Sequence, residues 1–82
     1  MKFVTYLKDE RDQLALLVDG QLYDLDRLHP DMPGSMTMLL NYWDDLIPIA
    51  SIIDKKIKAG DFKNLDTTLF DEADLLAPVL HP

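Results

Sequence analysis

The segment from Leu28 to Gly34 divides the chain into two parts of different character. It reads Leu-His-Pro-Asp-Met-Pro-Gly, and its two prolines push the residues before them out of the α region, while Gly34 allows a sharp turn. Patterns typical of strands precede this segment, and a pattern typical of helices follows it. The sequence therefore predicts an α+β fold with its strands first and its helices second.

Before this segment, the sequence predicts an antiparallel meander of three strands. Residues 2–8 are β-branched and aromatic, and the polar residues 9–12 are expected to form a tight loop. Residues 14–18 form an apolar run that is too short for an amphipathic helix. Asp19-Gly20 favours a two-residue hairpin turn, because both positions can adopt positive φ, and residues 21–25 would return as the third strand.

After the dividing segment, two helices are predicted to cover one face of this sheet. Ser35 is a good N-cap for a helix over residues 36–43, whose apolar side chains recur at helical spacing. A second helix is expected over residues 46–59, capped by Asp45, so that Pro48 occupies the third helical position. Within one long helix, Pro48 would cost about 3 kcal/mol and cause a kink.

The C-terminal part is predicted to be mostly extended. Residues 67–70 are interpreted as a short extended piece or the approach to a turn. A short strand near residues 75–77 would make the sheet four-stranded instead of three-stranded. The predicted core combines both halves of the chain and contains Val4, Tyr6, Leu16, Val18, Leu25, Leu39, Leu40, Trp43, Ile49 and Ile53.

Charge and composition exclude several classes of function. Fifteen acidic and eight basic residues give a net charge of −7, which disfavours nucleic acid and anionic membranes as partners. No apolar run approaches the ~18 residues of a membrane span. Without cysteine, the chain can form neither disulfides nor thiolate metal sites. We expect one small domain over residues 1–82, located in the cytoplasm.

No arrangement of residues predicts chemistry in this chain. His29 and His81 lie next to prolines near opposite ends of the sequence, and Ser35 and Ser51 are interpreted as a helix cap and a helix-face residue. A loose group of aspartates is explained by turn formation and helix capping: Asp31, Asp44 and Asp45. We therefore assign no catalytic, cofactor-binding or metal-binding residue.

A stripe of methionine and aromatic residues lies in the first predicted helix and includes Met36, Met38, Tyr42 and Trp43. Such a stripe is more often core than contact surface, although methionine and aromatic residues also favour adaptable binding surfaces. Met38 and Tyr42 are expected on the flank, where a partner can reach them.

Four segments follow one another in a characteristic order and spacing: residues 1–6, the hairpin 14–25, the link 29–34 and Leu75-Leu76-Ala77-Pro78-Val79. Together they resemble the N-terminal domain of the fumarylacetoacetate hydrolase family. In that family a Leu-Leu-Ala-Pro-Val-like segment links this domain to the catalytic domain, with another proline soon after. Pro82 stands in place of that later proline, so the resemblance implies that residues 75–82 are the linker.

The resemblance implies a parent enzyme, usually a homodimer, whose C-terminal domain binds Mg²⁺ or a similar divalent ion through acidic residues. A His-Glu pair in that domain activates water, and members hydrolyse carbon–carbon bonds of diketo acids or decarboxylate, hydrate or isomerise related keto acids. Here His29 is followed three places later by Met32 instead of Glu, and His81 only by Pro82, so no catalytic residue carries over.

This chain is therefore expected to be the non-catalytic N-terminal domain that packs against the family's C-terminal catalytic domain. The alternative is a free-standing small acidic module that binds other proteins. Such a module would use the helix over residues 36–43 and the extended C-terminal segment to dock on a basic or apolar partner.

Overall fold

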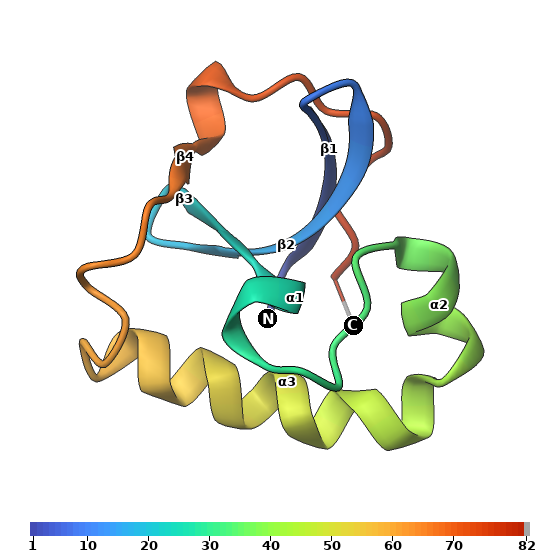
Figure 1. Cartoon of the computed structure of the whole chain (residues 1–82), viewed down its shortest axis with the longest axis vertical. Helices are drawn as coiled ribbons and strands as arrows, with labels where there is room; N and C mark the ends of the chain where they lie inside the picture. Colours follow the sequence, from blue (N-terminus) through green and yellow to red (C-terminus); the bar gives the residue numbers. More distant parts are fainter. Residues whose placement is uncertain (82) are drawn as a thin grey trace.

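A four-stranded antiparallel meander, curled into a half-barrel, forms the centre of the α+β fold, and three helices accompany it (Figure 1). The computed structural model describes residues 1–81. The strands follow one another in the order β1-β2-β3-β4. Their bounds are Phe3–Lys8 for β1, Arg11–Val18 for β2, Gln21–Asp24 for β3 and Thr68–Leu69 for β4.

Two tight turns set the register of the meander. The predicted turn at Asp19-Gly20 is confirmed, with φ values of 51° and 75°. The predicted loop over residues 9–12 is wrong, because β2 already begins at Arg11, which pairs with Lys8. Asp9 and Glu10 alone make this turn, with φ values of 51° and 65°. Polar side chains at the start of β2 are exposed, so they do not prevent the backbone from continuing the ladder.

The apolar run in β2 is explained by burial on both faces of the strand. Leu14, Leu16 and Val18 belong to the main core, which the helices cover. Ala15 belongs to a second cluster inside the half-barrel, and Leu17 packs against it. A strand covered on both sides loses the alternation of apolar and polar residues that marks a half-exposed strand.

The two predicted helices are confirmed, but their boundary lies elsewhere. α2 spans Met36–Asn41, and α3 spans Trp43–Lys58. Ser35 caps α2 as predicted, since its Oγ accepts a hydrogen bond from the N–H of Met38 at 3.3 Å.

The predicted position of Pro48 is wrong. Tyr42, not Asp45, is the N-cap of α3, so that Pro48 is the sixth helical residue. A proline there cannot donate to the carbonyl of Asp44. Asp44 is exposed, so water can satisfy that carbonyl.

A short helix that the sequence did not predict follows β3. α1 spans Leu25–Leu28, so it is a third helix beside the two predicted ones, and the prediction of a strand continuing to Leu25 is wrong. Leu25 is nevertheless fully buried, as predicted. A helix of four residues is too short to leave a periodic pattern in the sequence.

The predicted core is correct for most of its members. Leu40 is wrong, because it is 53% exposed, whereas its neighbour Leu39 is fully buried. Consecutive helical residues point in different directions, and only one face of α2 meets the main core. Trp43 and Ile49 are half-buried and pack against the main core, and the Trp43 ring lies edge-on to Phe3 with centroids 6.0 Å apart.

The C-terminal segment returns to the other edge of the sheet and runs beside β1 (Figure 1). The predicted extended piece at residues 67–70 contains β4, and a 3-10 helix spans Phe70–Glu72. Residues 75–77 form no strand, although Leu75 makes an isolated bridge with Tyr6. Leu80 exchanges two backbone hydrogen bonds with Phe3, at 2.8 and 2.9 Å. Pro82, the last residue of the predicted linker, lies outside the described residues.

The strained turn between β1 and β2 gives a prediction about stability. Glu10 has φ 65°, a left-handed conformation that glycine adopts without a steric penalty. Glu10→Gly is expected to raise the free energy of unfolding by about 0.5 kcal/mol in urea denaturation, since relief of strain exceeds the added entropy of the unfolded chain. Glu10→Ala removes the same charge but keeps the strain, and equal stabilisation by both variants would contradict this account.

Candidate functional site

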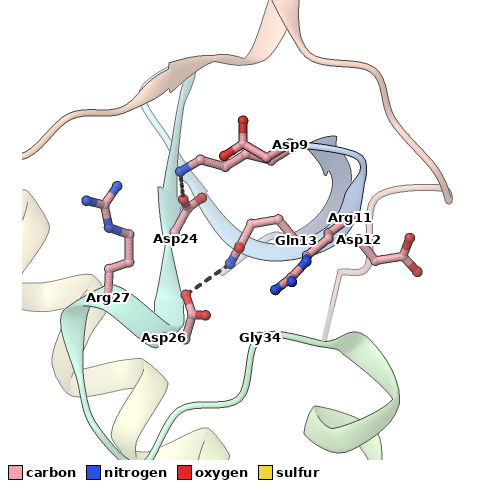
Figure 2. Close-up of a pocket in the computed structure, with 9 residues that line it drawn as sticks. Asp9, Arg11, Asp12, Gln13, Asp24, Asp26, Arg27 and Gly34 are labelled. Atoms are coloured by element: carbon pink, nitrogen blue, oxygen red, sulfur yellow. Dashed lines mark hydrogen bonds and ion pairs between the residues drawn. The ribbon is translucent and has the colours of Figure 1, made fainter.

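A polar hollow of about 680 Å³ lies between the β1–β2 turn, the end of β3 and α1 (Figure 2). Its lining is charged or polar apart from one glycine and consists of Lys8, Asp9, Arg11, Asp12, Gln13, Asp24, Asp26, Arg27 and Gly34. Four carboxylates and three cations therefore surround one opening. The hairpin supplies most of these groups because the exposed start of β2 extends beyond the end of β3.

Asp24 is the one carboxylate of this hollow that the fold buries, with 7% of its surface exposed. The Tyr6 hydroxyl donates to its Oδ1 at 2.6 Å, and Lys8 forms an ion pair with its Oδ2. Burying an unpaired carboxylate would be very costly, and these two partners compensate that cost. The same contacts explain why Asp24, at the N-cap of α1, makes no side-chain capping bond.

Tyr6 extends this network across the interior of the half-barrel. Its hydroxyl lies 3.4 Å from Thr68 Oγ1, so that β1, β3 and β4 are joined through side chains. Burial, and then the hydrogen bond to Asp24, raises the pKa of Tyr6 to about 12. Tyr6 therefore remains protonated and donates to Asp24 over the physiological pH range.

Gly34 holds the dividing segment against the hollow. Its carbonyl accepts from the N–H of Leu14 at 3.0 Å, and a Cβ atom on Gly34 would lie 2.9 Å from Asp26 Oδ2. Asp26 in turn accepts a hydrogen bond from Gln13 Nε2 at 3.0 Å. A side chain at Gly34 would therefore require the exposed Asp26 carboxylate to move.

This hollow has the character of a structural polar network. Asp24 and Lys8 neutralise one another, and Asp26 is bonded to Gln13, as Figure 2 shows. The lining residues include no serine, cysteine or histidine that could act as a nucleophile or as a proton carrier at neutral pH. What the arrangement can do chemically is hold water or a small polar molecule near Arg11 and Arg27.

The residues that line this hollow include none of the histidines and serines considered from the sequence. His29 stands in the dividing segment, where its Nδ1 accepts from the N–H of Asp31 at 3.1 Å. His81 is exposed at the other end of the described chain. Ser51 is on α3, as predicted, and its Oγ lies 4.0 Å from the sulfur of Met1.

Within residues 1–81, no three histidine, aspartate or glutamate side chains are grouped as a bound metal ion requires. The divalent ion that the family resemblance implies therefore has no fitting ligand set among these residues.

A second, more apolar hollow lies between the dividing segment and the helices. It measures about 440 Å³ and is lined by Pro30, Asp31, Met32, Pro33, Met38, Tyr42, Asp45 and Leu46. The prediction that Met38 and Tyr42 lie where a partner can reach them is confirmed, since they are 44% and 53% exposed. Met36 and Trp43 of the same stripe are half-buried and pack against the core.

Sequence reasoning missed the network of Tyr6, Asp24 and Lys8. One signal for it existed, because side chains in a strand alternate between faces and Asp24 falls on the same face as the apolar Leu22. The partners of a buried carboxylate depend on strand register, which the misplaced start of β2 obscured.

Comparison of the chain with protein-family models, with curated proteins and with solved structures found no match. Among residues 1–81, no helix combines the length and the apolar character that crossing a membrane requires.

The buried ion pair gives a prediction about stability at neutral pH. Asp24→Asn would leave Lys8 without its counter-charge and weaken the hydrogen bond from Tyr6. We therefore expect the free energy of unfolding, measured by urea denaturation, to fall by about 2–4 kcal/mol. Asp12→Asn serves as the control, because Asp12 lines the same hollow but is exposed. Equal effects of the two variants would show that Asp24 has no special structural role.

The raised pKa of Tyr6 gives a prediction at alkaline pH. The folded state favours the protonated phenol of Tyr6. Its contribution to the free energy of unfolding is therefore complete below pH 10 and is lost as the pH rises towards about 12. The free energy of unfolding should therefore fall more steeply over this interval in the wild type than in Tyr6→Phe. Tyr42→Phe, which changes an exposed tyrosine, should keep the wild-type slope. Parallel curves for the wild type and Tyr6→Phe would contradict the prediction.

Proposed function

We propose that this chain is the non-catalytic N-terminal domain of an enzyme of the fumarylacetoacetate hydrolase family. Its role is to pack against a C-terminal catalytic domain, in which Mg²⁺ or a similar ion and a His-Glu pair carry the chemistry. The parent enzyme, a cytoplasmic homodimer, would hydrolyse a carbon–carbon bond of a diketo acid or decarboxylate, hydrate or isomerise a related keto acid.

The observation that supports this proposal most strongly is the exposure of apolar side chains in the segment that resembles the family's linker. Leu75 and Leu76 are 41% and 47% exposed, although hydrogen bonds hold the backbone on both sides of Leu75 against β1. The backbone is thus fixed while two large apolar side chains remain in contact with water. A neighbouring domain seated along this edge would cover them, which is what the proposed role requires.

The geometry of the polar hollow is consistent with an accessory role. Its buried carboxylate is committed to Tyr6 and Lys8, so it is not available as a general base. Those contacts stabilise the fold that presents the linker-like segment.

Two experiments test the proposal: determining how far the reading frame extends, and substituting residues of the linker-like segment. We expect translation to continue beyond Pro82 into an acidic, metal-binding domain, and the full-length protein to process a diketo or keto acid with Mg²⁺. Replacing Leu75 and Leu76 by aspartate should change the stability of the present chain by less than about 1 kcal/mol, since exposed positions tolerate substitution. In the full-length protein the same change should lower the melting temperature and the activity.

Leu69→Asp is the matched control, because Leu69 is 49% exposed on β4, at the opposite end of the strand order. A stop codon directly after Pro82, with no such catalytic domain encoded nearby, would overturn the proposal. If replacing Leu75 and Leu76 by aspartate left the activity and stability of the full-length protein unchanged, the linker-like segment would no longer support the proposal.

The second candidate function is a free-standing acidic module that binds proteins. It is favoured by the exposed apolar side chains of Met38, Leu40 and Tyr42, which lie within five residues. Light scattering coupled to size exclusion distinguishes the two candidate functions, because a binding module forms a defined complex with a partner protein in the absence of any catalytic domain.

A further inference from the structure

The corner between α2 and α3, residues 38–45, gathers the surface features expected of a contact site. Met38, Leu40 and Tyr42 are 44%, 53% and 53% exposed. The helices pack their opposite faces, with Leu39 and Leu46, into the core. The corner is therefore anchored to the core, while its apolar side chains remain exposed to water.

Tyr42 stands between two hollows at this corner. One is the apolar hollow of about 440 Å³ described above, and the other measures about 320 Å³ and is lined by Leu40, Asn41, Tyr42, Trp43, Asp44 and Asp45. Tyr42 and Asp45 line both. A partner seated here would contact an aromatic ring from two sides, the kind of position at which binding energy concentrates.

The charge around these hollows is entirely negative. Asp31, Asp44 and Asp45 line them, and no lysine, arginine or histidine does. In the part of the chain that the structure describes, the ion pairs involve other carboxylates, those of Asp24 and Asp54. A basic group on a partner would therefore meet three carboxylates that are not already paired with a cation of residues 1–81.

We propose that the corner of residues 38–45 binds a segment of a partner protein in which large apolar residues alternate with lysine or arginine. An apolar side chain of the segment enters the hollow of about 440 Å³ beside Tyr42, where the flexible Met38 adapts to its shape. Basic side chains pair with the surrounding aspartates, which selects this segment over an equally apolar acidic one. A second copy of this chain is disfavoured as the occupant by its net charge of −7.

This inference names the partner chemistry for a binding role, and it rests on the proposed function only in that the chain works by contact with another polypeptide. It concerns a different surface from the linker-like segment. Failure of one proposal therefore leaves the other intact.

The test is a titration of the isotopically labelled chain with a short synthetic peptide in which leucine and phenylalanine alternate with lysine and arginine. The control peptide has glutamate in place of every basic residue. We expect the basic peptide to shift the backbone amide resonances of residues 38–46 and those next to Asp31, with an affinity that falls as salt is added. The acidic peptide should cause no such shifts.

Variants locate the site. Tyr42→Ala should weaken binding of the basic peptide by roughly tenfold, and Asp45→Asn by about threefold at low salt, with a smaller salt dependence. Two exposed positions elsewhere serve as controls: Ile52→Ala for apolar area and Glu72→Gln for charge should leave the affinity unchanged. Spectra of the free variants that match the wild type away from the substituted residue show that the fold is retained.

The proposal is overturned if the basic peptide does not bind, if both peptides bind equally, or if the shifts map to another surface. It is also overturned if Tyr42→Ala, while folded, binds as the wild type does. A dimer in light scattering that Tyr42→Ala dissociates would identify a second copy as the occupant, which would likewise overturn it.

Discussion

Burial of both faces of β2 is the constraint on which the rest of the structure depends. Leu14, Leu16 and Val18 need a cover on one side, and Ala15 and Leu17 need one on the other. The helices supply the first cover, and the curl of the sheet, closed by residues 70–79, supplies the second. A chain of this size buries only about 60% of the surface that its unfolded form exposes. Neither cover can therefore be lost without exposing a large part of the core.

The inner cluster differs from the main core because a buried carboxylate, that of Asp24, adjoins it. Asp24 is buried beside the polar hollow, where Tyr6 and Lys8 pair with it, and both partners come from alternate positions of β1. A shift of the β1–β2 register by one residue would point Tyr6 and Lys8 to the other face and leave Asp24 unpaired. The pairing of Asp24 thus adds to the register that burial of the apolar faces already specifies.

Much of this fold follows from local sequence, and the exceptions have identifiable physical causes. The Asp19-Gly20 turn, the Ser35 cap and the division into strands followed by helices depend on neighbouring residues, and the sequence predicts them correctly. The start of β2, the helix boundary at Tyr42 and the four-residue α1 depend on tertiary packing, which overrides weak local preferences. For the candidate sites, exposure of Met38 and Tyr42 could be predicted from helical spacing. The partners of Asp24 could not, since they require the correct strand register.

The strip of backbone that runs from Asp74 to Leu80 beside β1 has a consequence for how the protein behaves when it is incomplete. Through the bonds to Phe3, Thr5 and Leu7, it occupies an edge of the sheet that would otherwise offer unpaired N–H and C=O groups. Bare edges of this kind recruit strands from other molecules and begin aggregation or strand exchange. The segment that contains the exposed Leu75 and Leu76 therefore also protects the edge of the sheet, and its removal by a protease would leave β1 with an unpaired edge that favours assembly.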